Sequence, residues 1–173
     1  MAIDKIQSES INLADNFAFT GTVTGAGGVN TPYFTARLGS QQTGLSANTF
    51  TKVNFDTEDF DTDNTFSSNR FTPTTAGKYF CFYNLMISFS GGGTVEDIRA
   101  RFYKNGSTYS NLCNAQLKDY GSESLSLALF LGQSSIIDFN GSSDYLEVYA
   151  RNDASGGGTI VASSNFGAYK IIE

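Results

Sequence analysis

The chain has 173 residues and a formal net charge of −6, and charged residues make up only 16% of it. Histidine is absent, which excludes Ser-His-Asp and Cys-His nucleophile activation and zinc or iron sites with histidine ligands. The acidic balance argues against nucleic acid as a partner, because a protein that neutralises phosphates needs an excess of Lys and Arg. The aromatic share of 14%, the 18 Gly and the 2 Pro favour a β-rich fold in one domain.

The apolar runs are far shorter than the roughly 18 residues of a membrane-spanning helix, so we expect no membrane insertion. The first residues, 1–6, lack a charged stretch followed by an apolar one, so no signal peptide is expected. The two cysteines, Cys81 and Cys113, are too few for a disulfide framework. We interpret Cys81 as a buried free thiol within an aromatic run, with a Cys81–Cys113 bridge as the alternative.

Residues 1–30 differ in pattern from the rest of the chain and are predicted to form a short N-terminal arm. The arm ends in a Gly-rich joint at 25–28. We expect it to be a docking segment that becomes ordered on another surface, with a disordered leader as the alternative. The apolar side chains that would dock are too few to build a core: Ile11, Leu13, Phe17, Phe19 and Val23.

Residues 31–173 are predicted to form the folded domain. Period-two alternation of apolar residues indicates strands, and Asn105-Gly106 is a strong hairpin-turn signal. Short spacing between strands and the absence of a helical pattern after residue 30 predict an all-β sandwich or jelly roll. The expected strands cover 34–38, 50–55, 77–90, 98–103, 124–131, 145–150, 159–162 and 166–172.

The expected strand at 77–90 is apolar on both faces in its first half. Its odd positions run from Tyr79 to Phe89, and its even positions include Phe80, Phe82 and Met86. A two-layer sandwich that stays monomeric needs only one apolar face on each strand.

An ordered set of motifs resembles the globular head of the first complement component, which belongs with tumour necrosis factor (TNF) in a jelly-roll superfamily. The resemblance covers about residues 31–173. The motifs are, in order, Val53-Asn54-Phe55-Asp56, Arg70-Phe71-Thr72-Pro73, Ala76-Gly77-Lys78-Tyr79, Lys104-Asn105-Gly106 and Phe166-Gly167.

The resemblance implies a ten-strand, TNF-like jelly-roll β-sandwich that forms a compact homotrimer. On this reading Tyr79, Tyr83 and Leu85 face the core. The side chains expected at or near the trimer contacts are Phe80, Phe82, Tyr149 and Tyr169. Packing of these aromatic residues under long loops is the alternative.

The arm, from Ala14 to Gly25, resembles short N-terminal segments of tailed-phage structural proteins, and phage appendages reuse this jelly roll as trimeric tips. The resemblance implies a non-enzymatic virion protein that contacts other virion proteins through its arm. It would act as a tail-fibre tip in host attachment, with a host-surface glycan or protein as receptor, or as a capsid or tail decoration protein. The alternative is a secreted complement-head-like ligand-binding module, against which the missing leader and the missing Gly-X-Y stalk argue.

The acidic run 56–64 raises one metal hypothesis. Asp59, Asp61 and Asp63 are spaced by two and could supply oxygen ligands to calcium. The run lacks the Gly and bidentate Glu of an EF-hand loop, and a solvated acidic loop without a cofactor is the preferred interpretation. No pair of carboxylates stands out for glycoside hydrolysis, so we expect no enzymatic activity.

Overall fold

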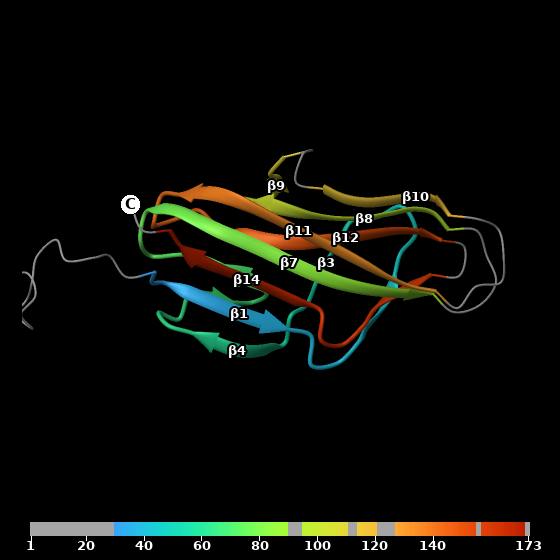
Figure 1. The fold of residues 1–173 in the computed structure, drawn as a ribbon, viewed down its shortest axis with the longest axis horizontal. Helices are drawn as coiled ribbons and strands as arrows, with labels where there is room; N and C mark the ends of the chain where they lie inside the picture. The colour runs from blue at the N-terminus through green and yellow to red at the C-terminus, as the bar shows by residue number, and fades with distance from the viewer. Residues whose placement is uncertain (1–29, 90–94, 111–113, 121–126, 155–156, 172–173) are drawn as a thin grey trace, which may run out of the picture.

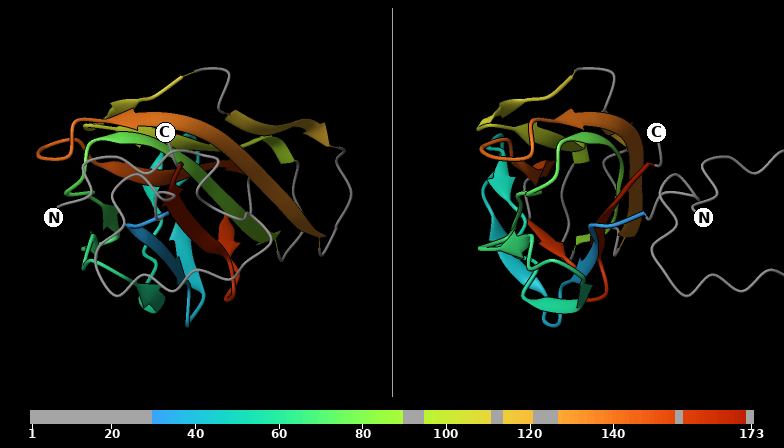
Figure 2. Two further views of the ribbon diagram at one scale, coloured as in Figure 1. Left: turned by 60° about the vertical axis from the view of Figure 1, so that its left-hand side comes forward. Right: turned by 90° about the vertical axis from the view of Figure 1, so that its left-hand side faces the viewer.

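The computed structural model describes residues 30–89, 95–110, 114–120, 127–154 and 157–171. These residues form two seven-stranded antiparallel sheets that face each other as a sandwich (Figures 1 and 2). The described residues contain strands and no helix, so none of them forms a helix suited to crossing a membrane. The predicted all-β architecture is confirmed, whereas residues 1–29 of the arm lie outside the described residues.

The first sheet is organised around one long central strand, β7 (Gly77–Phe89). β11 (Leu127–Phe139) runs antiparallel to β7 along its whole length, from the pair Phe139 and Gly77 to the pair Leu127 and Phe89. The remaining strands lie on the other side of β7. They are β14 (Asn165–Lys170), β1 (Tyr33–Arg37) and β4 (Thr57–Asp61) in that order, and β13 (Gly158–Ile160) with β2 (Gln42–Leu45) beyond it.

The second sheet is centred on β8 (Val95–Lys104) and β12 (Leu146–Ala154), which are paired along most of their length. β10 (Asn114–Tyr120) and β9 (Ser107–Thr108) pair with the other side of β8. Three two-residue strands complete the sheet beside β12: β3 (Thr51–Lys52), β6 (Arg70–Phe71) and β5 (Phe66–Ser67).

The core fills the space between the sheets and forms a single cluster. The odd positions of β7 from Tyr79 to Phe89 are buried, as the alternation predicted, and they meet Ile98, Ala100 and Phe102 from β8 across the sandwich. The Tyr83 hydroxyl donates a hydrogen bond of 2.6 Å to the Ala100 carbonyl and so ties the two sheets together. Cys81 is fully buried in this core, and Cys113 lies outside the described residues.

Several expected elements differ from the observed ones. The strand expected at 50–55 is reduced to β3, although Val53 and Phe55 are still buried. The resemblance implied ten strands, and the described residues form fourteen, four of which are only two residues long. Alternation did not reveal β2 or β10, since their sequences QTGL and NAQLKDY carry few apolar residues.

The prediction that the acidic run 56–64 is a loop was wrong for residues 57–61, whereas 56 and 62–64 lie outside any strand. Residues Thr57–Asp61 form the edge strand β4, which pairs antiparallel with β1. An edge strand tolerates acidic side chains because one of its sides is open to water, and the charges oppose pairing with a further chain. Period-two hydrophobicity is weak in such a strand and its charge pattern resembles that of a loop.

Candidate functional site: an exposed aromatic row

The large apolar side chains that stay exposed among the described residues all belong to the first sheet. They are Tyr33, Phe60, Phe130, Ile136 and Tyr169, with exposed fractions of 39%, 48%, 77%, 56% and 40%. Scattered exposed apolar residues are ordinary on a soluble protein, but a concentration on one face marks a contact surface.

The strand register lines up most of these side chains into one row. Ile136 lies opposite Phe80 on β7, Phe80 lies opposite Tyr169 on β14, and Tyr169 lies opposite Tyr33 on β1. The ring centroids of Phe80 and Tyr169 are 5.3 Å apart, and the Tyr33 and Phe60 rings meet edge to face at 5.3 Å. We call these five residues, which are four aromatic residues and the aliphatic Ile136 at one end, the aromatic row; it crosses β11, β7, β14, β1 and β4.

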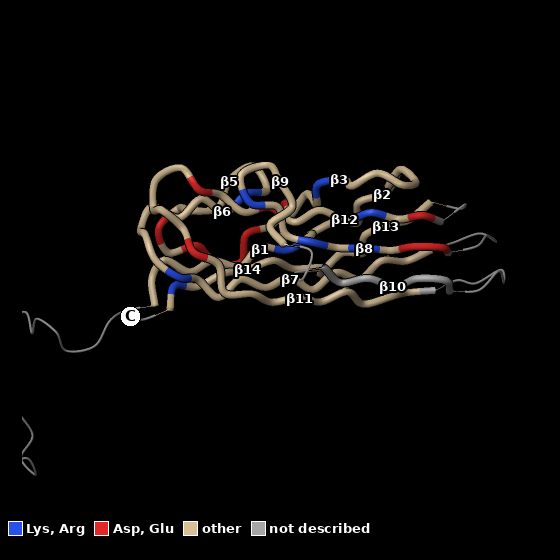
Figure 3. The backbone as a smooth tube through the Cα atoms, turned by 90° about the horizontal axis from the view of Figure 1, so that it is seen from above, with Lys and Arg blue, Asp and Glu red and all other residues tan. Residues whose placement is uncertain are grey.

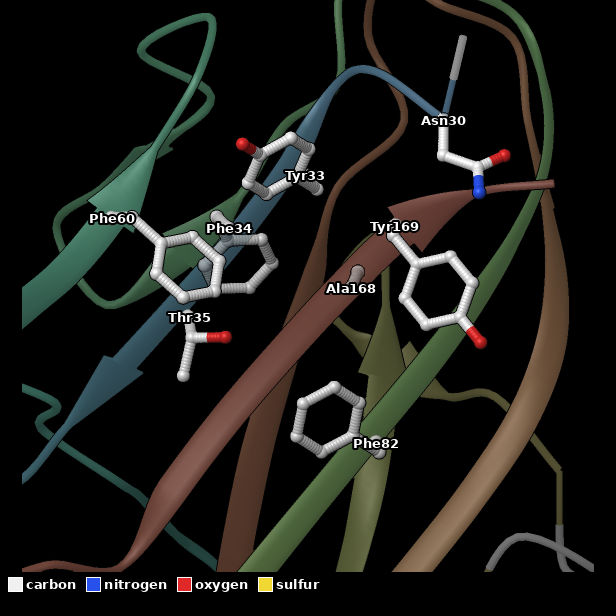
Figure 4. A pocket seen from close by; sticks show the side chains of 8 residues that line it. All are labelled: Asn30, Tyr33, Phe34, Thr35, Phe60, Phe82, Ala168 and Tyr169. Atoms are coloured by element: carbon white, nitrogen blue, oxygen red, sulfur yellow. The ribbon is translucent and has the colours of Figure 1, made fainter. Parts of the chain in front are cut away.

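Phe82 stands beside the aromatic row, with its ring centroid 6.2 Å from that of Phe80. It lines a pocket of about 450 Å³ on the outer surface of the sheet (Figure 4). The side chains of Tyr33, Phe60 and Tyr169 surround the same pocket, and Asn30, Phe34, Thr35 and Ala168 complete its lining. The pocket walls are therefore largely aromatic.

A second hollow of about 250 Å³ lies further along the same face, lined by Phe130, Met86 and residues 162–165 among others. Phe130 is opposite Met86 in the register of β11 and β7. The even positions of β7 from Phe80 to Ser88, and of β11 from Ala128 to Ile136, include no Asp, Glu, Lys or Arg. Charge is found at the margins of this face, where Arg37 pairs with Asp59 at 2.7 Å.

The structure brings together three of the four predicted trimer-contact residues. Phe80, Phe82 and Tyr169 share the outer face of the first sheet, but Tyr149 belongs to β12 of the second sheet. There its ring stacks on Tyr103 at a centroid distance of 4.0 Å. Sequence reasoning missed Tyr33, Phe60, Phe130 and Ile136. For Phe130 a signal existed, because it falls on the face opposite the leucines of its alternating strand.

The three proposed calcium ligands are engaged with protein groups. Asp59 accepts a hydrogen bond from Arg37 Nε. Asp61 accepts hydrogen bonds from the Thr65 hydroxyl at 2.9 Å and from the Phe66 amide at 2.7 Å. Asp63 accepts one from the Thr62 hydroxyl at 3.2 Å. Within the described ranges, no group of three or more Asp, Glu or Cys residues is arranged to hold a metal ion. The docking-arm residues Ile11, Leu13, Phe17, Phe19 and Val23 lie outside the described residues.

The second sheet carries a buried carboxylate next to Tyr149. Glu147 is 2% exposed, and its Oε1 accepts hydrogen bonds from Lys52 Nζ at 2.7 Å and from Arg70 Nε at 3.0 Å. Burial acts to raise the pKa of Glu147, but these two cations outweigh it and hold the pKa below its ordinary value. Burial raises the pKa of the Tyr149 hydroxyl, and the negative Glu147 raises it further.

No protein-family model and no curated protein matches the chain in sequence. Solved structures do match its fold. The globular domain of the zebrafish complement 1qA protein superposes with a TM-score of 0.52 at 18% identity, over 81% of this chain and 96% of that one. The Eiger TNF of S. frugiperda gives 0.53 at 10% identity, over 81% and 93%. Murine APRIL gives 0.55 at 9% identity, over 80% and 99%. The chain therefore has the TNF and complement-head type of jelly roll.

Proposed function

We propose that the protein is a non-enzymatic structural protein of a tailed-phage virion, displayed as a homotrimeric jelly roll. Three copies pack through the first sheet, and the N-terminal arm attaches the trimer to other virion proteins. The displayed domain serves in host-surface recognition as a fibre or appendage tip, or decorates the capsid or tail. The observation that carries the proposal is the aromatic row together with the uncharged stretch of β7 and β11 beside it, from Phe80 to Ser88 and from Ala128 to Ile136.

Burial of this face in an assembly is energetically favourable. Each large side chain that leaves water contributes about 1.5 to 3 kcal/mol before ordering costs. Ile136, Phe130 and Phe60 are about half exposed or more in the single chain, so about half or more of this contribution is still available from each. A second copy of the chain could cover this face without any other protein. The resemblance to the complement head and TNF implies that three copies assemble.

The virion context rests on the sequence. The arm resembles N-terminal segments of tailed-phage structural proteins, and the composition is low in charge and rich in Gly. A display role also fits the absence of His, which removes the most common general base. Within the described residues no cluster of three or more acidic side chains could hold a metal ion for hydrolysis.

A secreted complement-head-like binding module is the second candidate. The likeness of the fold to the zebrafish complement 1qA globular domain favours it. The two candidates share the trimer and differ in the role of the arm and in the location of the protein. Neighbouring genes for portal, capsid and tail proteins would support the virion proposal over this one.

Light scattering on the purified full chain tests the assembly. We expect a mass three times that of the 18.6 kDa chain at micromolar concentration, and a monomer for Ile136→Asp, because it would bury an unpaired carboxylate. Ser107→Asp on the exposed β9 hairpin of the second sheet is the matched control and should remain a trimer. A wild-type monomer would refute the assembly.

Immunogold labelling of intact phage particles with an antibody to the jelly roll tests the virion role. Label on the head or on the tail supports the proposal and also separates decoration from a fibre tip. Absence of label on particles whose lysate contains the protein would contradict it.

A further inference from the structure

The cations of the second sheet outnumber its carboxylates, although the whole chain is acidic. Figure 3 shows Lys and Arg positions along β8, β12 and β3. Three arginines, Arg99, Arg101 and Arg151, are neighbours on the outer face, since Arg99 lies opposite Arg151 and Arg101 lies opposite Tyr149 in the register of β8 and β12. Like charges placed directly opposite each other disfavour a sheet, so the arrangement needs compensation.

Two of these three arginines have carboxylate partners. Arg99 Nη2 lies 2.7 Å from Asp97 Oδ2, and its Nε donates to Asp97 Oδ1 at 3.0 Å. Arg151 Nη2 lies 3.5 Å from Asp153 Oδ2 and 3.8 Å from Asp97 Oδ2. Asp97 and Asp153 thus form ion pairs with Arg99 and Arg151, and neither carboxylate pairs with Arg101.

Arg101 has no carboxylate partner among the described residues. Its guanidinium lies 4.0 Å from the centroid of the Phe50 ring, and its Nη1 makes one long hydrogen bond, 3.4 Å, to Thr108 Oγ1. Its Nε is buried and makes no hydrogen bond within that part of the chain. Burial lowers the pKa of Arg101, and the charges of Arg99 and Arg151 lower it further, yet a guanidinium stays protonated at neutral pH.

A half-buried cation next to two others is costly to the folded state when its buried Nε makes no hydrogen bond among the described residues. A planar carboxylate is the group that would satisfy it, because it accepts two parallel hydrogen bonds from a guanidinium fork. The surroundings add apolar surface, since Phe50, Tyr103 and Tyr149 are all half-buried beside Arg101. Charge next to aromatic rings suits a sugar acid, which carries a carboxylate on a ring with apolar C–H faces.

We infer that the outer face of β8 and β12 is a binding site for acidic saccharides, with Arg101 receiving the carboxylate and the adjoining aromatic side chains contacting the sugar ring. The inference rests on the proposed function in one respect, because it names a ligand class for the displayed domain. The site itself lies within one chain and on the sheet opposite the aromatic row. Loss of the trimer and loss of binding can therefore be measured separately.

Binding of the full chain to immobilised polygalacturonate, with uncharged dextran as the reference polymer, tests the site. We expect polygalacturonate to bind and dextran not to bind. Free galacturonate should compete with the polymer, because one sugar acid fills the site. Competition by acetate at the same concentration would show that the carboxylate is recognised without the sugar ring, and would overturn the saccharide assignment. Equal or tighter binding of polyglutamate would overturn it in favour of an acidic peptide.

The variant Arg101→Gln should weaken polygalacturonate binding at least about tenfold, the loss expected for a charge-assisted hydrogen-bonded pair. Arg37→Gln is the matched control, because Arg37 is paired with Asp59 on the first sheet, and it should bind like wild type. Trimer mass should be unchanged in both variants. The unfolding temperature of Arg101→Gln should equal or exceed that of wild type, since the substitution removes an uncompensated charge.

Arg101→Lys supplies a second readout should the glutamine variant fail to fold. It keeps the charge but lacks the planar fork, so it should also bind more weakly than wild type. Wild-type affinity in either folded variant, or no binding of polygalacturonate by the wild-type protein at low salt, would refute the site.

Discussion

The ring of Phe82 occupies the space that a side chain at Gly167 would need. The two residues lie opposite each other on β7 and β14, and a Cβ added to Gly167 would approach Phe82 Cζ to 2.6 Å and the Phe34 carbonyl oxygen to 2.9 Å. The absence of a side chain at Gly167 thus allows the Phe82 ring to lie over this residue, beside the aromatic row. Gly167, a residue of the Phe166-Gly167 motif on β14, therefore influences where the Phe82 ring lies on the proposed contact face.

Gly167→Ala is expected to displace Phe82 and to weaken the trimer. The added methyl group meets backbone on one side, so relief must come from the ring, and overpacking of this kind costs about 1 to 3 kcal/mol. Sedimentation velocity over a concentration series should show dissociation at higher protein concentration than for wild type. The double variant Gly167→Ala with Phe82→Ala should regain part of the thermal stability, because the smaller side chain vacates the space. Equal stability of the single and double variants would contradict this account.

Phe82→Asp and Tyr149→Ser should differ in their effect on assembly, because the two side chains lie on opposite sheets. Phe82→Asp places a carboxylate in the proposed contact and is expected to yield monomers. Tyr149→Ser removes a ring that stacks on Tyr103 and should leave the mass unchanged. Light scattering on both variants is the measurement. The reverse outcome would place the trimer contact on the second sheet.

Glu147→Gln is expected to destabilise the fold by about 1 to 3 kcal/mol at neutral pH, because Lys52 and Arg70 lose the carboxylate that they share. Since the pKa of Glu147 is lower in the folded state than its ordinary value of 4.5, the unfolded chain binds the proton first as the pH falls. The stability from this carboxylate is therefore present above about pH 4.5 and is lost as the pH decreases through the folded pKa.

Denaturant unfolding of wild type and Glu147→Gln at a series of pH values measures this dependence. The difference in unfolding free energy between the two proteins should narrow on acidification. Asn54→Gln, an exposed loop substitution, serves as the control for general acid effects. A difference that stays constant from neutral to acidic pH would show that the carboxylate contributes through packing and not through its charge.

The sequence predicted the fold well where local pattern and burial coincide. In β7, β8 and β12 one face is buried, and the alternation of apolar residues indicates which face it is. The core residues of these strands, such as Tyr83, Phe102 and Val148, could therefore be predicted from the sequence. β4 and β10 escaped prediction because edge strands are held by backbone pairing, and their side chains need not alternate in hydrophobicity.

The candidate sites were less accessible to sequence reasoning because both depend on register across strands. Ile136, Phe80 and Tyr33 are far apart along the chain and become neighbours only through three separate strand pairings. The lack of a carboxylate partner for Arg101 among the described residues could not be predicted from the sequence either, because it depends on the pairing of Asp97 with Arg99 and Arg151 and of Asp153 with Arg151. Alternation within one strand could predict only which side chains share a face, as it did for Phe80 and Phe82 on β7.

We expect the N-terminal arm to attach through a short apolar segment. Ile11, Leu13, Phe17 and Phe19 are too few to form a core of their own, and each would contribute about 1.5 to 3 kcal/mol on burial in a partner surface. Ordering the arm opposes this by about 1 to 2 kcal/mol per residue, which favours a docking segment shorter than the whole arm. We place that segment at 11–23, with 25–28 as the joint.

In the proposed trimer three arms would act together through their effective concentration, so modest single contacts would give durable attachment. The double variant Phe17→Ser with Phe19→Ser is therefore expected to abolish incorporation into virions while the free protein remains a folded trimer. Quantification of the protein in purified particles, from a phage that carries the double variant, measures incorporation. Ser8→Thr with Ser10→Thr, outside the proposed segment, is the matched control and should be incorporated like wild type. Normal incorporation of the phenylalanine double variant would show that the jelly roll itself makes the attachment.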